Sequence, residues 1–161
     1  MEKKILIVLI LLLAVYIAFA GGNNKTKLNN PFNIKRTTYP YAGKVIGNFG
    51  TFEHFENIQF SVAAYLSLLQ RNYFKLGFNT LEKIVYKYAP PEENDTKKYI
   101  SDLSNETGFA PDEVLKFDFN TMWRICKAQA KLESSYKLDY NTFLKGWIMY
   151  KFYKTINTLK K

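Results

Sequence analysis

The chain has 161 residues and a formal net charge of +9, which favours anionic partners such as phospholipid, cell-wall polymers or nucleic acid without choosing among them. Hydrophobic residues make up 47% of the sequence and aromatic residues 17%, which excludes a disordered protein and fits one compact domain. Cys126 is the single cysteine and His54 the single histidine, so the sequence excludes an internal disulfide and predicts no zinc site and no cofactor.

Residues 1–20 predict a segment directed to a membrane. Lys3 and Lys4 precede residues 5–20, which carry no charge. The Ala-Phe-Ala sequence before Gly21 fits cleavage of a secretory signal. The apolar run also approaches the ~20 residues that span a bilayer, which fits a retained anchor with the lysines inside and the domain outside. Cleavage would leave a soluble exported protein, whereas a retained anchor would hold the chain to a membrane through residues 5–20.

The domain boundaries follow from composition. Residues 21–33 are rich in Gly, Asn and Lys and predict a linker, so that residues 34–161 form the domain. Residues 34–52 combine β-branched and aromatic residues with Pro40 and several glycines. This combination favours short extended segments or a small hairpin over helix.

Two helices are predicted in the first half of the domain. Apolar residues recur at spacings of three and four over residues 55–76, which predicts a core helix that stops at Gly77. Asn79 and Glu82 have the spacing of a capping box and start a short second helix. The proline pair at 90–91 ends it.

The rest of the chain predicts four more helices from cap residues and apolar periodicity. They are a helix from residues 94–96 to Gly108, one that begins near Pro111, one from 120–121 to 133–136, and one from about Asp139 to Thr158. In the last helix, apolar residues along one side predict docking on the core. Cys126 lies beside Ile125 in this pattern and is expected to be a buried structural thiol. The expected fold is mainly α with a short extended N-terminal region.

Four segments together carry a resemblance. They are NNPFNIK at 29–35, FENIQFSVAAYLSLLQRNY at 55–73, NTLEKIVYKYAPPEENDTKKYI at 79–100 and TGFAPDEV at 107–114. The Asn-Thr, Ala-Pro-Pro and Asn-Asp-Thr elements in this order are the specific part. In these segments the chain resembles a family of bacteriophage virion and cell-wall-lysis proteins with peptidoglycan-cleaving, lysozyme-like domains. The resemblance covers most of residues 29–136 and implies a compact lysozyme-like helical domain with peptidoglycan as partner.

The chain also departs from the resembled family. Gln59, Ser61 and Ala63 stand where relatives carry Glu, Gly and Arg, and Phe32 replaces a glycine. If that Glu or Arg performs chemistry in the family, this chain has lost it. The segment AKLESSY keeps the family's Glu, here Glu133, followed by a small residue.

Glycan cleavage without a metal depends on carboxylates. Glu133 is the candidate acid, and the resemblance to lytic transglycosylases implies that one Glu acts first as acid and then as base. Asp95 and Glu56 are the other candidate catalytic carboxylates. The alternatives are a helix carboxylate paired with Lys137 for Glu133, a helix cap for Asp95, and a first-turn residue for Glu56. The Gly-Leu-Gln part of the transglycosylase motif is absent, and only 28 residues follow Glu133, so a standard transglycosylase domain is not supported.

Two functions follow. The first is a membrane-anchored phage or envelope protein that binds and cleaves peptidoglycan glycan strands for wall penetration, in the manner of a lytic transglycosylase or muramidase. The alternative is a non-catalytic virion structural protein at a membrane, whose partners are other virion proteins. Nucleic acid is not an expected partner, because the lysines are dispersed along the sequence and no nucleic-acid-binding motif accompanies them. The expected location is a membrane, with the domain outside the cytoplasm or within the virion.

Overall fold

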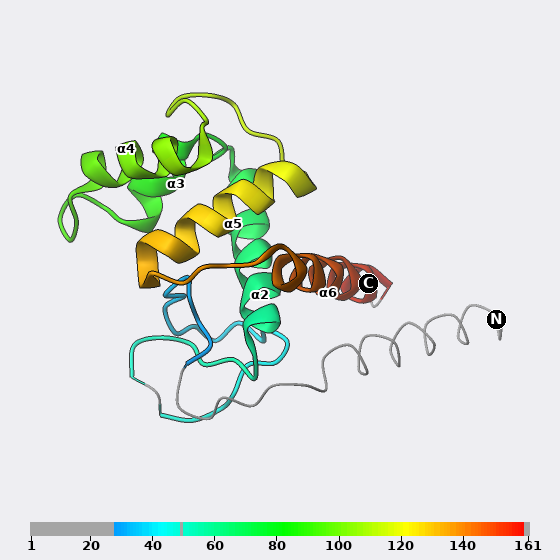
Figure 1. Cartoon of the computed structure of the whole chain (residues 1–161). Coiled ribbons are helices and arrows are strands. Elements are labelled where there is room, and N and C mark those ends of the chain that lie inside the picture. Colours follow the sequence, from blue (N-terminus) through cyan, green and yellow to red (C-terminus); the bar gives the residue numbers. More distant parts are fainter. Residues whose placement is uncertain (1–27, 49, 160–161) are drawn as a thin grey trace.

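The computed structural model describes residues 28–48 and 50–159, and this part of the chain is mainly helical, as predicted. Its elements are α2 (Ile58–Asn72), the short 3-10 helix η1 (Phe74–Leu76), α3 (Leu81–Tyr88), α4 (Thr96–Thr107), α5 (Phe119–Ser134) and α6 (Tyr140–Leu159). Helix α6 packs along α2, while α4 packs against both α3 and α5. Figure 1 shows α2 in the middle of the molecule, with α3 and α4 together at one end.

Side-chain caps fix where the helices begin. The capping side chains are Asn57 for α2, Thr80 for α3, Asp95 for α4 and Asp118 for α5. Because Asn57 accepts the backbone N–H of Phe60, α2 begins at Ile58 and not at the predicted residue 55. The predicted capping role of Asn79 is wrong, since Thr80 takes it. The predicted starts of α4 and α6 agree with the structure to within a residue or two.

The helix predicted to begin near Pro111 is wrong. Residues 111–118 form a turn and an irregular connection. The backbone N–H of Leu115 donates to the carbonyl of Asn79 at 2.8 Å, and the N–H of Glu82 donates to the carbonyl of Pro111 at 2.9 Å. These bonds tie the connection to the start of α3. Backbone groups that a helix would pair locally are therefore used in tertiary contacts.

The core surrounds α2. Tyr65 in its middle is fully buried, and the Phe32 ring stacks on it with centroids 4.4 Å apart and planes 3° apart. Phe32, which the resemblance marks as a departure, is thus part of the core. Cys126 is also fully buried, which confirms the prediction of a structural thiol, and burial raises the pKa of this thiol.

Helix α6 docks on α2 through a close approach at Gly146. A Cβ atom at this position would lie 2.5 Å from the Cβ of Val62, so the contact requires glycine. Phe143 and Tyr150, on the predicted docking side of α6, are buried, which confirms that prediction. The Tyr150 hydroxyl donates a hydrogen bond to Oε1 of Gln70 on α2.

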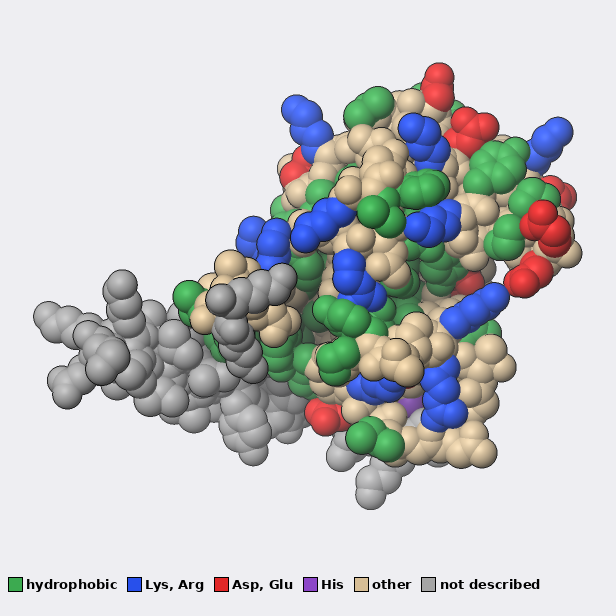
Figure 2. Space-filling model, turned by 180° about the vertical axis from the view of Figure 1, so that it is seen from behind, with side chains coloured by type: hydrophobic (Ala, Val, Ile, Leu, Met, Phe, Trp, Pro, Cys, Tyr) green, Lys and Arg blue, Asp and Glu red, His purple; other side chains and the backbone are tan. Residues whose placement is uncertain are grey.

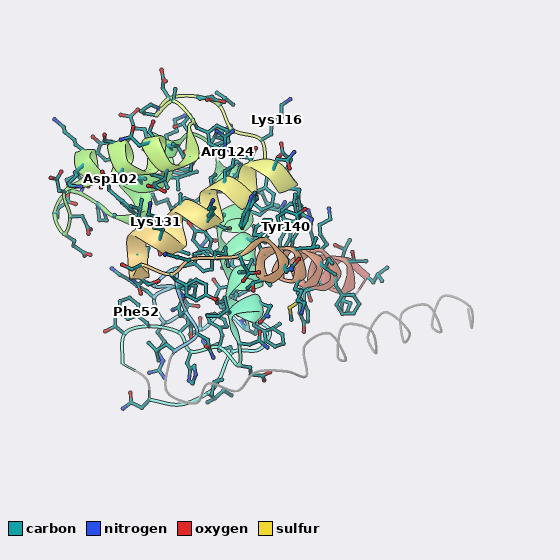
Figure 3. All side chains as sticks on the ribbon, viewed as in Figure 1. Phe52, Asp102, Lys116, Arg124, Lys131 and Tyr140 are labelled. Carbon is teal, nitrogen blue, oxygen red and sulfur yellow. The ribbon has the colours of Figure 1, made fainter. Side chains whose placement is uncertain are left out.

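Two further contacts link α5 to α4 and to Phe109, which follows the C-terminal end of α4. Nζ of Lys131 lies 2.6 Å from Oε1 of Glu106, and the Arg124 guanidinium lies 3.8 Å from the ring centroid of Phe109. Figure 3 shows both basic side chains on α5.

The segment before α2 consists of turns, bends and irregular stretches joined by two isolated antiparallel bridges, and it contains no strand within its described residues. Buried Asn30 organises it. Its Nδ2 donates to the carbonyls of Ile34 and Glu53 at 3.0 and 3.1 Å, and its Oδ1 accepts the N–H of Ile34 at 3.0 Å. One amide side chain therefore holds two stretches of this segment together.

None of the helices in the described part of the chain combines the length and the apolar character needed to cross a membrane. The apolar segment at 5–20, predicted as a signal or an anchor, lies outside the described residues.

Candidate functional site at the end of helix α5

Glu133 lies half-buried in the last turn of α5, and both of its carboxylate oxygens accept hydrogen bonds. Nδ2 of Asn33 donates to Oε2 at 3.0 Å, and the hydroxyl of Tyr99 on α4 donates to Oε1. Asn33 Nδ2 also donates to the backbone carbonyl of Glu133 at 2.9 Å. The side chain therefore connects the N-terminal segment, α4 and α5.

A buried amide extends this arrangement. Nε2 of Gln129, one turn before Glu133, donates to the Tyr99 hydroxyl at 2.7 Å, and Gln129 is fully buried. We call Glu133, Asn33, Tyr99 and Gln129 the Glu133 seat. The seat is a hydrogen-bonded chain that runs from Gln129 through Tyr99 to Glu133, which Asn33 also contacts. Oε1 of Gln129 is buried and has no hydrogen-bond partner among the described residues.

Tyr99 of the seat and Tyr88 nearby are held in their neutral form. Burial, followed by the charge of Glu133, raises the pKa of Tyr99 and that of Tyr88. The Tyr88 hydroxyl donates to the backbone carbonyl of Phe32. Both phenols therefore act as hydrogen-bond donors at neutral pH.

The seat is suited to a carboxylate that holds segments together. A catalytic acid has to present its proton to the substrate within hydrogen-bond reach. For Glu133 to do so, Tyr99 or Asn33 would have to give up the oxygen that it now occupies. The geometry therefore accounts for Glu133 without a bound substrate.

Two segments discussed with the resemblance, one of the four that carry it and the one that includes Glu133, meet here. Asn33 belongs to NNPFNIK and Glu133 to AKLESSY, and the two residues are 100 positions apart in the sequence. Oγ of Ser134 adds a second link, because it donates to the carbonyl of Pro31 at 3.0 Å. Sequence reasoning singled out both segments but did not predict this contact.

The other two candidate carboxylates lie elsewhere. Asp95 is exposed and accepts the backbone N–H of Lys98 at 3.1 Å as the cap of α4, which is the alternative role given above. Glu56 is exposed just before α2, and its charge adds to the effect of burial in raising the pKa of Tyr153. No hydrogen bond within residues 28–48 and 50–159 joins either carboxylate to Glu133.

Glu53 is a buried carboxylate that sequence reasoning missed. It accepts the backbone N–H of Thr37 at 2.8 Å and pairs with Nζ of Lys44 at 2.8 Å. Its side chain is 1% exposed and that of Lys44 is 20% exposed. This pair holds the segment before α2 in shape, because a buried charge needs both an opposite charge and hydrogen bonds.

The surface has no concentrated basic block on the face seen in Figure 2. Lys and Arg side chains are dispersed over this face, whereas many of the acidic ones lie toward the end that carries α3 and α4. In the described part of the chain, no three His, Cys, Asp or Glu side chains are grouped closely enough to hold a metal ion.

Comparison with known proteins gives one relationship and one negative result. The chain is 30% identical over 124 residues to protein P5 of Pseudoalteromonas phage PM2. The alignment covers 74% of this chain and 76% of P5. No family model matches the chain.

Proposed function

The chain belongs to the family of protein P5 of Pseudoalteromonas phage PM2, and from this relationship we propose that it is a structural protein of a bacteriophage virion. The relationship to P5 is the observation that carries the proposal. It agrees with the phage part of the resemblance noted in the sequence. Other virion proteins are then the partners of the chain, and residues 5–20 are its contact with a membrane.

The hydrogen bonds of the Glu133 seat give this carboxylate a role in the fold that requires no substrate. They join the N-terminal segment to α4 and α5. A charged group with these partners stabilises one arrangement of the chain, because removing a partner would leave a buried donor unpaired. In this proposal Glu133 holds the N-terminal segment, α4 and α5 together and takes no part in a reaction.

Glycan cleavage is the second candidate function. It is supported by the position of Glu133, a half-buried carboxylate at a helix end, and by the resemblance to lysozyme-like domains. In this case Glu133 would donate its proton to the glycosidic oxygen after Tyr99 or Asn33 moved away. Asp95 and Glu56 remain the further candidate carboxylates.

Two measurements test these functions. Quantitative mass spectrometry of purified phage particles tests the first, and we expect the full chain in a fixed ratio to the other particle proteins. Absence of the chain from particles that infect normally would overturn the structural role.

A muropeptide-release assay with the full-length chain tests the second function. Glu133→Gln is compared with Glu92→Gln, a matched change at an exposed glutamate. Release that stops only in Glu133→Gln would assign cleavage to this carboxylate. Equal muropeptide release by both variants would show that Glu133 takes no part in cleavage. If the unsubstituted chain released no muropeptides from any wall substrate, cleavage would be excluded and the structural role would be the remaining function.

A further inference from the structure

A cavity of about 720 Å³ lies away from the Glu133 seat, between α2, the C-terminal half of α6 and the loop at 39–42. Small-molecule sites commonly have volumes of roughly 300–1,000 Å³. None of the residues of the Glu133 seat lines this cavity. It is therefore a separate site with its own chemistry.

The cavity carries positive charge and no negative charge. Arg71, Lys75 and Lys154 line it, and no Asp or Glu does. Within the part of the chain that the structure describes, none of these three side chains forms a salt bridge. Two carboxylates outside the cavity affect its wall. The charge of Glu53 adds to the raised pKa of Tyr41, and that of Glu56 adds to the raised pKa of Tyr153. Glu53 is already paired with a lysine, so the net field in the cavity favours an anion.

Arg71 is held in position by the wall of the cavity. Its guanidinium lies 3.4 Å from the ring centroid of Tyr39. Nε donates to Oδ1 of Asn72 at 2.9 Å, and one terminal nitrogen donates to the Tyr41 hydroxyl at 3.4 Å. The other terminal nitrogen is buried and has no hydrogen-bond partner among the described residues. The guanidinium is therefore fixed in place, and Arg71 contributes its positive charge to the wall of the cavity.

The rest of the wall is aromatic and hydroxylated. Tyr39, Tyr41, Tyr150 and Tyr153 line the cavity, and Ser67 and Gln70 add polar side chains, with the Tyr150 hydroxyl bonded to Oε1 of Gln70. Such a wall suits a ligand whose organic part carries hydroxyl groups.

We propose that this cavity binds a phosphate ester, with the phosphate against Arg71, Lys75 and Lys154 and the hydroxylated organic part among the tyrosines. The three cations come from α2, η1 and α6, and a phosphate can offer each of them one of its tetrahedrally arranged oxygens. A planar carboxylate, in contrast, can be bound by a single arginine. The phosphate ester has two sources, a free polyol phosphate or the headgroup of a glycerophospholipid.

The test is isothermal titration calorimetry on the full-length chain with two probes. Glycerol 3-phosphate represents the free ligand, and dihexanoyl phosphatidylglycerol below its micelle concentration represents the headgroup without a bilayer. Saturable binding of either probe supports the proposal, and the tighter of the two identifies the source.

Variants locate the binding. Lys75→Met/Lys154→Met and, separately, Arg71→Met should weaken binding by about tenfold or more, since each removes charge-assisted contacts to the phosphate. Lys75 and Lys154 are exposed, so the double variant keeps the test valid if Arg71→Met fails to fold. The matched control is Lys97→Met/Lys137→Met, which removes the same charge from exposed positions outside the cavity and should leave the affinity unchanged.

Three results would overturn the proposal. They are no saturable binding of either probe, equal weakening in the control variant, and tighter binding of succinate than of glycerol 3-phosphate. The second result would show a general charge effect, and the third would show a carboxylate site.

Discussion

The Glu133 seat and the cavity beside Arg71 use charged side chains in opposite ways. At the seat, both oxygens of Glu133 are occupied by donors from two other segments. In the cavity, Arg71, Lys75 and Lys154 have no carboxylate partner within the described residues. Because buried polar groups are normally paired, the charge of the seat is used by the fold, and that of the cavity remains available to a ligand. The partners of a charged residue, more than its type, indicate its role.

The strongest test of this comparison removes the ring that anchors the segment of Asn33. Phe32→Ala should lower the free energy of unfolding by about 3–5 kcal/mol, because a fully buried phenylalanine leaves a cavity. Urea denaturation measures this loss. Phe152→Ala, at a partly exposed position on α6, is the control and should cost far less. Equal losses in the two variants would show that the segment of Asn33 does not anchor the seat.

The next test removes the carboxylate itself. Glu133→Ala should destabilise the fold by about 1–3 kcal/mol, because Asn33 and Tyr99 each lose an acceptor. Glu133→Gln keeps one acceptor oxygen and should cost less. Chemical denaturation of both variants, with Glu92→Gln as control, checks the order. If Glu133→Ala were as stable as the control, the seat would not hold the segments together.

Alkaline pH probes Tyr150, one of the tyrosines in the wall of the cavity. Burial raises the pKa of Tyr150 to about 12, against a usual value near 10. The folded chain therefore favours the neutral phenol, so this contribution to stability is complete below pH 10 and is lost as the pH rises through about 12. Thermal melts between pH 9 and 12 should show this loss, and it should be smaller in Tyr150→Phe. An identical pH dependence in Tyr150→Phe would contradict the assignment.

The smallest effect is expected from the lysines of the cavity. Lys75→Met/Lys154→Met should change the free energy of unfolding by no more than about 0.5 kcal/mol, since both side chains are exposed and unpaired within the described residues. Thermal denaturation followed by circular dichroism measures the change. A loss as large as that of Glu133→Ala would mean that these lysines serve the fold, and the contrast with the seat would disappear.

Local signals predicted much of the helical structure. Asp95 as a cap, Gly108 as a stop and the apolar face of α6 were all visible in short stretches of sequence, because capping and amphipathicity depend on neighbours within a few residues. The same reasoning failed at Pro111. There, an N-terminal helix signal was overridden by hydrogen bonds to the start of α3, which no local pattern contains.

The candidate site was predictable only in part. Glu133 was singled out through the resemblance, but its partners Asn33 and Tyr99 were not, since they come from the N-terminal segment and from α4. Gln129, which donates to Tyr99, was not singled out either. The cavity gave no sequence signal at all. Arg71 and Lys154 are 83 positions apart and belong to different helices, so only the docking of α6 on α2 brings them together.

By itself, the sequence determined the mainly helical class and several helix ends, because these depend on residue type and short-range spacing. The choice of Glu133 as a candidate rested on the family resemblance. The tertiary structure alone decided that the carboxylate of Glu133 is bound by Asn33 and Tyr99 and that the cations near Arg71 face a cavity without a carboxylate. The physical reason is that hydrogen bonding and burial are set by which distant segments pack together, and this packing follows from the path of the whole chain.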